Sequence, residues 1–592
     1  MRKTLLILLP LLAFSYLSVS AQQVVRLGSG SYASFAPLSA SRTDERGGSQ
    51  AYQMEHRRLY LPDSLLQRLG SPDGSKPGTL ALPSNDWWTH ALVNQWTGKI
   101  WMYPGWVEAT DQGLSIGYPD HWEETGCEVK WPDPLTATFV NAATGKRSAF
   151  TEALVDSWSD FMVSFIMQDG DSWVRVTCVH GSPIVWIEAN GVKVNVTNPS
   201  AGRYAVAQTV AGGRQWTTVG LLTQGIDAQK IAQYAQRVPR STRINYSYDA
   251  TKASLSTTFS VLTEDINLQS VPAAAPVMIA FLPHHIYSDR VTVNGSSDTP
   301  AFTGEYLSPR GTMKVLEGNN FTFNYTVHGI LPFFPKPLEW AEGFSADRMQ
   351  ALNADYAARG TFGGDTYWGG KGLTQMMHYM TFALQMGDTA TFRLAKQRLK
   401  ENLVDWYTYT PGELRRYFAR YNRWGALVGF DCSYDSDTFN DHHFHYGYFV
   451  YASAVLCMLD ADFREQYGAI VREVARDYAN WERIDSQKSK AMRCLSLGSA
   501  PLIRIADIRL QAAWATAATA TAKSQPARLY RAGVAYGCLV LHWATNRCLR
   551  QVYSATRSRH VLPLSIGSTA SAGTLIIRNT NTPTAATSPC RA

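Results

Sequence analysis

The hydrophobic pattern changes character once along the chain. Between about residue 85 and residue 335, short stretches with apolar residues at alternate positions are separated by turn residues. Residues 172–189 (SWVRVTCVHGSPIVWIEA) predict two strands joined at His180, Gly181 and Ser182. The stretches VMIAFLPHHIY and FTFNYTVHGIL predict further strands. Short alternating strands at this spacing indicate a β-sandwich.

From Ser345 onward the apolar residues recur at about 3.6 positions, the period of an amphipathic helix. The stretches that show this period are separated by Gly, Pro or Asp; they are residues 346–360, 372–388, 390–409, 441–460 and 464–484. Repeated helices of this length suit a helical bundle or an α/α toroid. The predicted fold class is therefore multidomain β + α. A β-sandwich domain with an N-terminal wrap-around segment occupies residues 22–335, and a helical domain occupies residues 336–485.

The first 21 residues predict an exported protein. Arg2 and Lys3 precede a short apolar run, and small residues around Ala21 offer a cleavage position. This is the pattern of a secretory signal peptide, which we assign to residues 1–21. No later segment approaches the roughly 18 uninterrupted apolar residues of a membrane span. We expect a secreted, periplasmic or extracellular protein with no membrane partner.

The charge is unevenly distributed, although the chain as a whole carries a formal charge of +7. Residues 486–592 hold fourteen Lys and Arg residues but a single acidic residue, Asp507, and no Glu. This tail is rich in Ala, Thr, Ser and Arg. A basic tail is a candidate for binding nucleic acid or a membrane surface. The basic residues show no clustering, however, and we expect no nucleic-acid partner.

One motif concentrates polar chemistry. The stretch FNDHHFHYGYFVYASAVL (Phe439–Leu456) has three histidines and an aspartate at the start of an apolar run. If a helix opens at Asn440 and Asp441, then Asp441, His445 and Tyr448 fall on one face. Asp441 is then a plain N-cap, a zinc ligand together with His445, or a catalytic acid. The zinc interpretation needs a third ligand and lacks the HExxH form.

The catalytic interpretation must overcome the helix dipole, which favours an ionised carboxylate at a helix N-terminus. Crowding by Phe439, Phe444 and Tyr446 would desolvate the Asp441 carboxyl group and raise its pKa. A second carboxylate nearby would act in the same direction, and glycoside hydrolysis requires such a pair. The 18 Trp and 29 Tyr residues supply either platforms that stack on sugar rings or the core of the sandwich.

Several motifs, taken in order, resemble one enzyme family. They are LPSNDWWTHAL (Leu82–Leu92), WMYPGWVEATDQGLSIGYPD (101–120), YWGGKGLTQMMHYM (367–380) and RWGALVGFDCSYDSDTFNDHH (423–443), which leads into NDHHFHYGYFVYA. Together they resemble glycoside hydrolase family 81, the endo-β-1,3-glucanases. The resemblance covers roughly residues 80–485, and the order and number of the motifs make it specific.

The resemblance implies a β-sandwich packed on an (α/α)6-barrel-type helical domain. It implies inverting endo-hydrolysis of β-1,3-glucan without a metal or other cofactor. Asp441 matches the family's general acid and His445 a substrate-binding residue, while Tyr434 and Lys371 are weaker matches to substrate-binding positions. The expected partner is β-1,3-glucan, and we expect a monomer. Two alternatives remain: a β-glucan-binding protein without turnover, and an inverting glycosidase acting on another linkage.

The family's general base is missing. It is a Glu in a Glu-Ser-x-Ser-Glu-Ala-like stretch, whereas no Glu follows Glu482 here and residues 522–529 read AKSQPARL. Synonymous codons allow this peptide to be read in a neighbouring frame as Gln-Glu-Ser-Ala-Ser-Glu-Ala. Residues 503–510 allow another family-like segment, Asp-Pro-Tyr-Cys-Gly-His-Ser-Phe. We predict a one-nucleotide frame slip near residues 485–500. The helical domain would then be incomplete, the tail 486–592 aberrant, and this chain nearly inactive.

Overall fold

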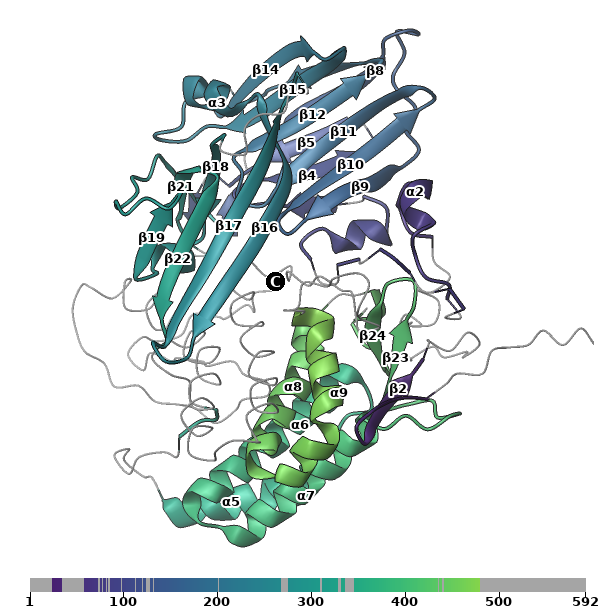
Figure 1. The fold of residues 1–592 in the computed structure, drawn as a ribbon, viewed down its shortest axis with the longest axis vertical. Helices are drawn as coiled ribbons and strands as arrows, with labels where there is room; N and C mark the ends of the chain where they lie inside the picture. Colours follow the sequence, from purple (N-terminus) through teal and green to yellow (C-terminus); the bar gives the residue numbers. More distant parts are fainter. Residues whose placement is uncertain are drawn as a thin grey trace, which may run out of the picture.

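The computed structural model describes residues 24–34 and, with short gaps, residues 58–479. The gaps are residues 73–74, 77, 81, 84–85, 97, 112, 120, 124–127, 131–132, 201, 268–274, 309–310, 328–331, 336–344, 435 and 439–440. The predicted signal peptide and the predicted aberrant tail lie outside the described residues. Most of the β-sheets form the upper part of the molecule in Figure 1, and the long helices lie in the lower part beside one small sheet.

The sandwich is built from antiparallel sheets. The six-stranded sheet, in the order β14-β15-β12-β11-β10-β9, consists of β9 (Ala153–Ser159), β10 (Met162–Asp169), β11 (Ser172–Val179), β12 (Ile184–Asn190), β14 (Tyr204–Ala211) and β15 (Arg214–Leu221). The five-stranded sheet, in the order β13-β8-β5-β4-β3, consists of β3 (Gly98–Trp101), β4 (Trp106–Thr110), β5 (Gly113–Gly117), β8 (Leu135–Asn141) and β13 (Val192–Thr197). The two strands predicted within residues 172–189 are confirmed as β11 and β12.

Smaller sheets and short helices complete this part. A four-stranded sheet, β16-β17-β22-β19, contains β16 (Arg237–Asp249), β17 (Ser254–Asp265), β19 (Arg290–Val293) and β22 (Asn320–Thr326). A three-stranded sheet contains β18 (Val277–Phe281), β20 (Glu305–Tyr306) and β21 (Met313–Gly318), and β6 (His121–Glu123) pairs with β7 (Glu128–Lys130). The short helices are α2 (Asp63–Leu66), η1 (Thr89–Leu92), α3 (Ala228–Tyr234) and α4 (Pro283–Ile286).

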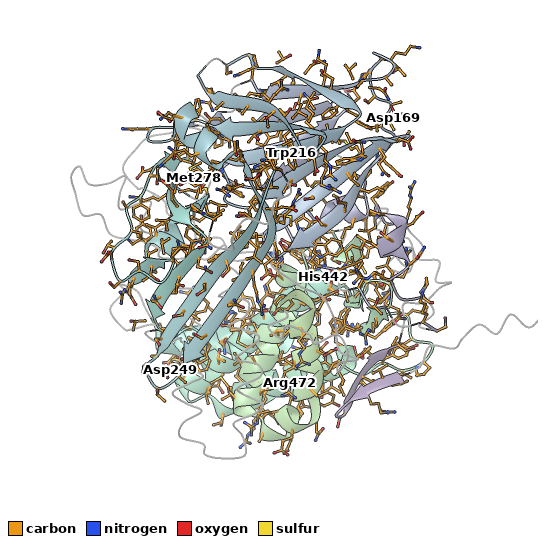
Figure 2. The ribbon with its side chains drawn as sticks, turned by 45° about the horizontal axis from the view of Figure 1, so that its top comes forward. Asp169, Trp216, Asp249, Met278, His442 and Arg472 are labelled. Atoms are coloured by element: carbon orange, nitrogen blue, oxygen red, sulfur yellow. The ribbon has the colours of Figure 1, made fainter. Side chains whose placement is uncertain are left out.

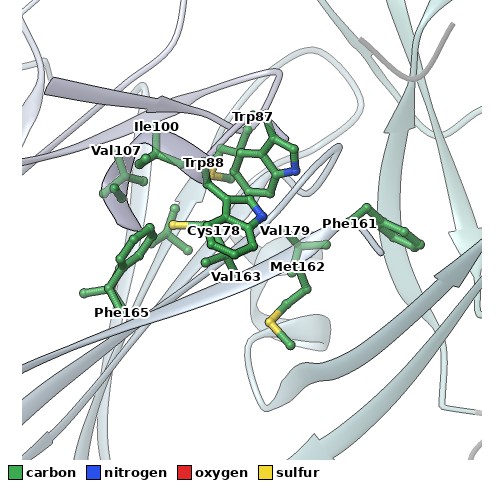
Figure 3. Close-up of a cluster of buried hydrophobic side chains, with 14 of the residues drawn as sticks. Trp87, Trp88, Ile100, Val107, Phe161, Met162, Val163, Phe165, Cys178 and Val179 are labelled. Carbon is green, nitrogen blue, oxygen red and sulfur yellow. The ribbon is translucent and has the colours of Figure 1, made fainter. Parts of the chain in front are cut away.

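The tryptophan motif near residue 87 belongs to the core of the sandwich. Trp88 has no exposed surface and Trp87 has 8%. Figure 3 shows both indoles packed with Val163 and Cys178 of neighbouring strands. Burial of such large apolar surfaces stabilises the packing of the sheets. At these two positions the tryptophans therefore fill the core and do not serve as exposed sugar platforms.

Each of the five predicted helical stretches contains a helix in the structure, although residues 480–484 of the last stretch lie outside the described residues. These helices are α5 (Ala346–Arg359), α6 (Thr366–Met386), α7 (Thr389–Trp406), α8 (His442–Leu459) and α9 (Ala461–Ala479). Helix α6 begins earlier than predicted, because the Asp365 side chain accepts hydrogen bonds from the backbone N–H groups of Tyr367 and Trp368. Among the helices that the structure describes, none is both long enough and apolar enough to cross a membrane.

A hairpin that the sequence analysis did not predict joins the two halves. Strands β23 (Tyr417–Tyr421) and β24 (Ala426–Phe430) form a sheet with the N-terminal strands β1 (Val24–Leu27) and β2 (Gly30–Ala33), in the order β1-β2-β23-β24. Alternate residues face different cores. Tyr417, Ala419 and Tyr421 pack in the core of the sandwich, whereas Phe418 and Leu427 pack among the helices. The hairpin therefore packs in both hydrophobic cores and connects the sandwich to the helices.

Candidate active site

Asp441 lies immediately before α8, as the sequence predicted. Its backbone adopts the left-handed conformation, with φ 57° and ψ 16°, and the residue is half-buried. Its carbonyl oxygen accepts hydrogen bonds from the N–H groups of Phe444 and His445, both at 2.9 Å. Its side chain makes no capping hydrogen bond. The interpretation of Asp441 as a plain side-chain N-cap is therefore wrong, because the backbone alone starts the helix.

The first turns of α8 are anchored by polar bonds made in a buried environment. His442, His445 and Tyr446 are almost completely buried. The Nδ1 atom of His445 lies 2.9 Å from the Thr366 hydroxyl of α6. The N–H of Gly429 on β24 donates to the Tyr446 hydroxyl at 2.9 Å. These bonds fix the helix start, and with it Asp441, against α6 and the hairpin.

His445 is held in its neutral form. Burial, and secondarily the neighbouring His442, lowers the pKa of His445 to about 3. A neutral imidazole has one donor nitrogen and one acceptor nitrogen. At neutral pH His445 therefore acts by hydrogen bonding and not by supplying a positive charge.

An aromatic cluster surrounds Tyr367, at the start of α6. The Tyr367 ring lies 4.9 Å from the ring of Tyr434, 5.3 Å from that of His445, 5.9 Å from that of Phe444 and 6.3 Å from that of Tyr448, measured between centroids. Tyr434 and Phe444 are 49% and 41% exposed. The cluster thus presents aromatic faces to solvent within one helical turn of Asp441.

Lys371 adds a cation to this cluster. Its Nζ atom lies 3.2 Å from the Tyr367 hydroxyl and 4.7 Å from the ring centroids of both Tyr367 and Trp368. The Trp368 ring is itself 46% exposed. The structure thus brings His445, Tyr434 and Lys371, the three predicted substrate-binding residues, around Tyr367. A lysine and exposed rings in this arrangement suit the hydroxyl groups and C–H faces of a sugar.

The segment that carries Tyr434 is fixed to the start of α6. The Ser433 hydroxyl donates to Asp365 at 2.9 Å, and the N–H of Thr366 donates to the carbonyl of Asp431 at 3.0 Å. Tyr434 itself has a positive φ of 53°, which costs about 1 kcal/mol for a non-glycine residue. Such a conformation persists where surrounding bonds enforce it. Tyr434 is therefore held in place by the hairpin and by α6.

Further carboxylates gather beside the site. After burial itself, the nearby Asp437, Asp431 and Asp365 contribute to raising the pKa of the Cys432 thiol. Asp437, in the short helix η2 (Ser436–Thr438), is 1% exposed. Within the described parts of the chain, no group of three or more His, Cys, Asp or Glu is arranged to hold a metal ion.

Tyr367, Trp368 and Phe444 were not predicted from the sequence as binding residues. Phe444 was expected to crowd the carboxyl group of Asp441, but its ring is stacked with that of Tyr367 and is partly exposed. The Tyr446 ring, with the same expected role, is buried against Phe418. A signal for Tyr367 and Trp368 was present, since they lie two and three residues after Asp365, the capping residue of α6.

The region that contains this site matches a known family. Residues 345–497 match the Glycosyl hydrolase family 81 C-terminal domain, a range that begins just before α5 and includes Lys371, Tyr434, Asp441 and His445. The chain is similar to proteins of this family. Among the similar proteins is the glucan endo-1,3-beta-D-glucosidase of Thermobifida fusca, to which the chain is 29% identical over 521 residues. The same-named protein of Acetivibrio thermocellus is 28% identical over 457 residues.

The chain spans less than two thirds of the length of these relatives. The alignments cover 81% and 69% of this chain, but only 63% of the Thermobifida protein and 56% of the Acetivibrio protein. A solved family 81 structure from Clostridium thermocellum, determined as a mutant, has a TM-score of 0.62 and 23% identity. That likeness covers 87% of this chain and 73% of the other, and it supports the mixed β and α fold.

Proposed function

We propose that this protein is a secreted, monomeric endo-β-1,3-glucanase that inverts the anomeric carbon, with Asp441 as its general acid. The exposed aromatic cluster around Tyr367 and Lys371, whose member Phe444 follows Asp441 by three residues, is the observation that carries the proposal. The names of the family 81 relatives support β-1,3-glucan as the substrate. The pattern of residues 1–21 supports export.

The site residues have distinct roles in this reaction. Asp441 protonates the glycosidic oxygen as the bond to the leaving sugar breaks, and a base on the opposite face of the ring activates water. In inverting enzymes the two carboxyl groups stand about 6.5–9.5 Å apart, which leaves room for that water. Tyr434, Lys371 and the neutral His445 hold the sugar in place by stacking and hydrogen bonds. No cofactor takes part in the proposed mechanism.

The proposal assigns a general acid but no general base in this chain. No Glu follows Glu482, and the family match ends at residue 497, within the window in which we predict a frame slip. We infer that residues 486–592 replace the part of the helical domain that would carry the base. The chain as written then binds glucan but turns it over slowly or not at all.

Two measurements test this proposal. Resequencing of the gene across codons 480–530 shows whether the neighbouring frame encodes the expected Glu-containing stretch; unrelated codons in an intact frame would remove the frame-slip hypothesis. A reducing-sugar assay on laminarin then compares the chain as written with the restored-frame product. We expect activity only in the restored product, and robust turnover by the present chain would show that it needs no further base.

A second candidate is a β-glucan-binding protein without catalysis, which the absence of Glu after Glu482 favours. Co-sedimentation with insoluble β-1,3-glucan, together with no hydrolysis by the restored-frame product, would support it. The remaining alternative, hydrolysis of another linkage, is separated by a panel of β-1,3-, β-1,4- and α-linked glucans, since fold alone does not determine the substrate.

A further inference from the structure

A buried histidine–carboxylate pair lies directly behind the proposed acid. His442, the residue after Asp441, places its Nδ1 atom 2.5 Å from Oδ2 of Asp477 on α9, and neither side chain has exposed surface. The other ring nitrogen, Nε2, lies 2.6 Å from the carbonyl oxygen of Ser436. In Figure 2 His442 lies at the end of the helices nearest the sheets, and Arg472 lies further along the same bundle.

The partners of His442 determine its protonation. A carbonyl oxygen only accepts hydrogen bonds, so Nε2 must carry a proton to bond Ser436. The other oxygen of Asp477, Oδ1, accepts from the N–H of Leu427 at 2.9 Å, which favours an ionised carboxylate. An ionised Oδ2 can only accept a hydrogen bond, so the Nδ1 atom of His442 must also carry a proton to bond it. The contacts of both ring nitrogens therefore favour an imidazolium.

The charges around the pair agree with this state. Asp437 and Asp477 both raise the pKa of the buried Tyr446 hydroxyl, with Cys432 also contributing, while burial remains the main cause. Two buried carboxylates in one region need a positive counterpart. His445, three residues further along α8, is neutral, because its pKa is lowered to about 3. His442 is thus the histidine placed to balance this negative charge.

We propose that His442 and Asp477 form a buried imidazolium–carboxylate pair that acts as a positioning device for Asp441. The pair joins the first residue of α8 to α9, to β24 through Leu427, and to η2 through Ser436. Asp441, one residue earlier, has a positive φ of 57°, and the fixed neighbour helps to hold that conformation. This role rests on the proposed function of Asp441 as general acid.

The pair contributes positioning and not net stability. A buried ion pair costs desolvation that often cancels its attraction, so its replacement by a neutral pair of the same shape is often tolerated. Asp477→Asn is such a replacement. The asparagine oxygen still accepts from Leu427, its NH2 group donates to a neutral His442, and His442 still donates to Ser436. The pair remains without net charge, so any change at Asp441 reports its orientation.

Nuclear magnetic resonance of the full chain tests both parts of the proposal, the charge of His442 and the positioning of Asp441. With ring-15N histidine, we expect His442 to show protons on both ring nitrogens at pH 7, and to lose the Nδ1 proton in Asp477→Asn. A wild-type spectrum with an unprotonated His442 nitrogen would overturn the assignment of charge, and it needs no variant to fold. This readout is independent of glucan hydrolysis, so its failure is distinguishable from failure of the proposed function.

The positioning role is read from the carboxyl 13C signal of Asp441, assigned with Asp441→Asn. In Asp477→Asn we expect the titration midpoint of Asp441 to move by at least about 0.5 pH unit. Ser453→Ala is the matched control, because it removes a buried bond to Tyr407 further along α8 and should leave the midpoint unchanged. An unmoved midpoint in Asp477→Asn, or an equal shift in both variants, would contradict the proposal.

Discussion

Asp441 occupies a backbone conformation that residues other than Gly, Asn and Asp rarely adopt. Its positive φ costs about 1 kcal/mol, and it is maintained by the hydrogen bonds of its carbonyl oxygen and by the anchoring of His442. Because the helix is started by the backbone, the side chain is not used as a cap. A short, polar residue that tolerates this conformation therefore suits the position.

Tyr367 provides the sharpest residue-scale prediction about binding. Its ring contacts the rings of Tyr434, His445, Phe444 and Tyr448 and the ammonium group of Lys371. Tyr367→Ala should weaken laminarihexaose binding about tenfold, or about 1.4 kcal/mol, because it removes the centre of the aromatic cluster. Isothermal titration calorimetry on the present chain measures this loss.

The control for this experiment is a tyrosine outside the cluster. Tyr356 on α5 is 51% exposed and its ring stacks with that of Tyr379, 6.0 Å away. Tyr356→Ala should leave laminarihexaose affinity unchanged. Equal affinities for Tyr367→Ala and the unmodified chain would show that glucan does not bind at this cluster.

At the scale of elements, sequence periodicity predicted the helices but not the hairpin that supports the site. Strand β24 is apolar on both faces, and β23 is apolar except at Arg420, because one face packs in the sandwich and the other among the helices. A strand buried on both sides lacks the alternation by which strands are recognised. The pairing of β2 with β23 joins Ala33 to Ala419, a contact that no local pattern reveals. The contacts of Tyr367 with α8 also join segments far apart in the sequence, so no local pattern predicted them.

The N-terminal strands should be integral to the helical part. Gly28 has a φ of +68°, and a Cβ atom there would lie 2.5 Å from the carbonyl oxygen of Gln466 on α9. Gly28→Ala should therefore lower the free energy of unfolding by more than about 2 kcal/mol, from backbone strain and the clash together. Chemical denaturation measures the change.

Gly145 offers a matched comparison for that substitution. It has nearly the same φ, +66°, but nothing lies within 4 Å of its added Cβ. Gly145→Ala should lower the free energy of unfolding by only about 1 kcal/mol, because it adds backbone strain but no clash. If the two substitutions cost the same, the contact between the N-terminal strands and α9 contributes nothing to stability.

At the scale of the whole molecule, buried histidines make the fold sensitive to acid. Burial lowers the pKa of His180 and His285 to about 3 and that of His378 to about 4. Below the ordinary histidine pKa of about 6.5 the unfolded chain binds protons that the folded chain cannot bind. Stability is therefore lost as the pH falls from about 6.5 toward these lowered values. Asp86 opposes the trend, since burial raises the pKa of its carboxyl group.

Substitution of His285 measures the contribution of one buried histidine to this loss of stability in acid. Its ring packs against those of Phe259, Phe281 and Phe323 at 5.1–5.6 Å. His285→Leu should reduce the difference in unfolding free energy between pH 7 and pH 4.5 by about 2–3 kcal/mol, because the variant has no proton to gain on unfolding. Denaturation curves at the two pH values give this difference. An unchanged difference would mean that His285 is protonated in the folded chain.

The proposed role of Asp441 as general acid is tested most directly by laminarin turnover. The measurement compares the initial rate of reducing-end release by the restored-frame product with that of its Asp441→Asn variant, which keeps the shape of the side chain but cannot donate as an acid. We predict robust release by the former and a loss of roughly 10²–10⁴-fold in the variant. A variant that hydrolyses laminarin within a few-fold of the unmodified enzyme would contradict the assignment of Asp441 as the general acid.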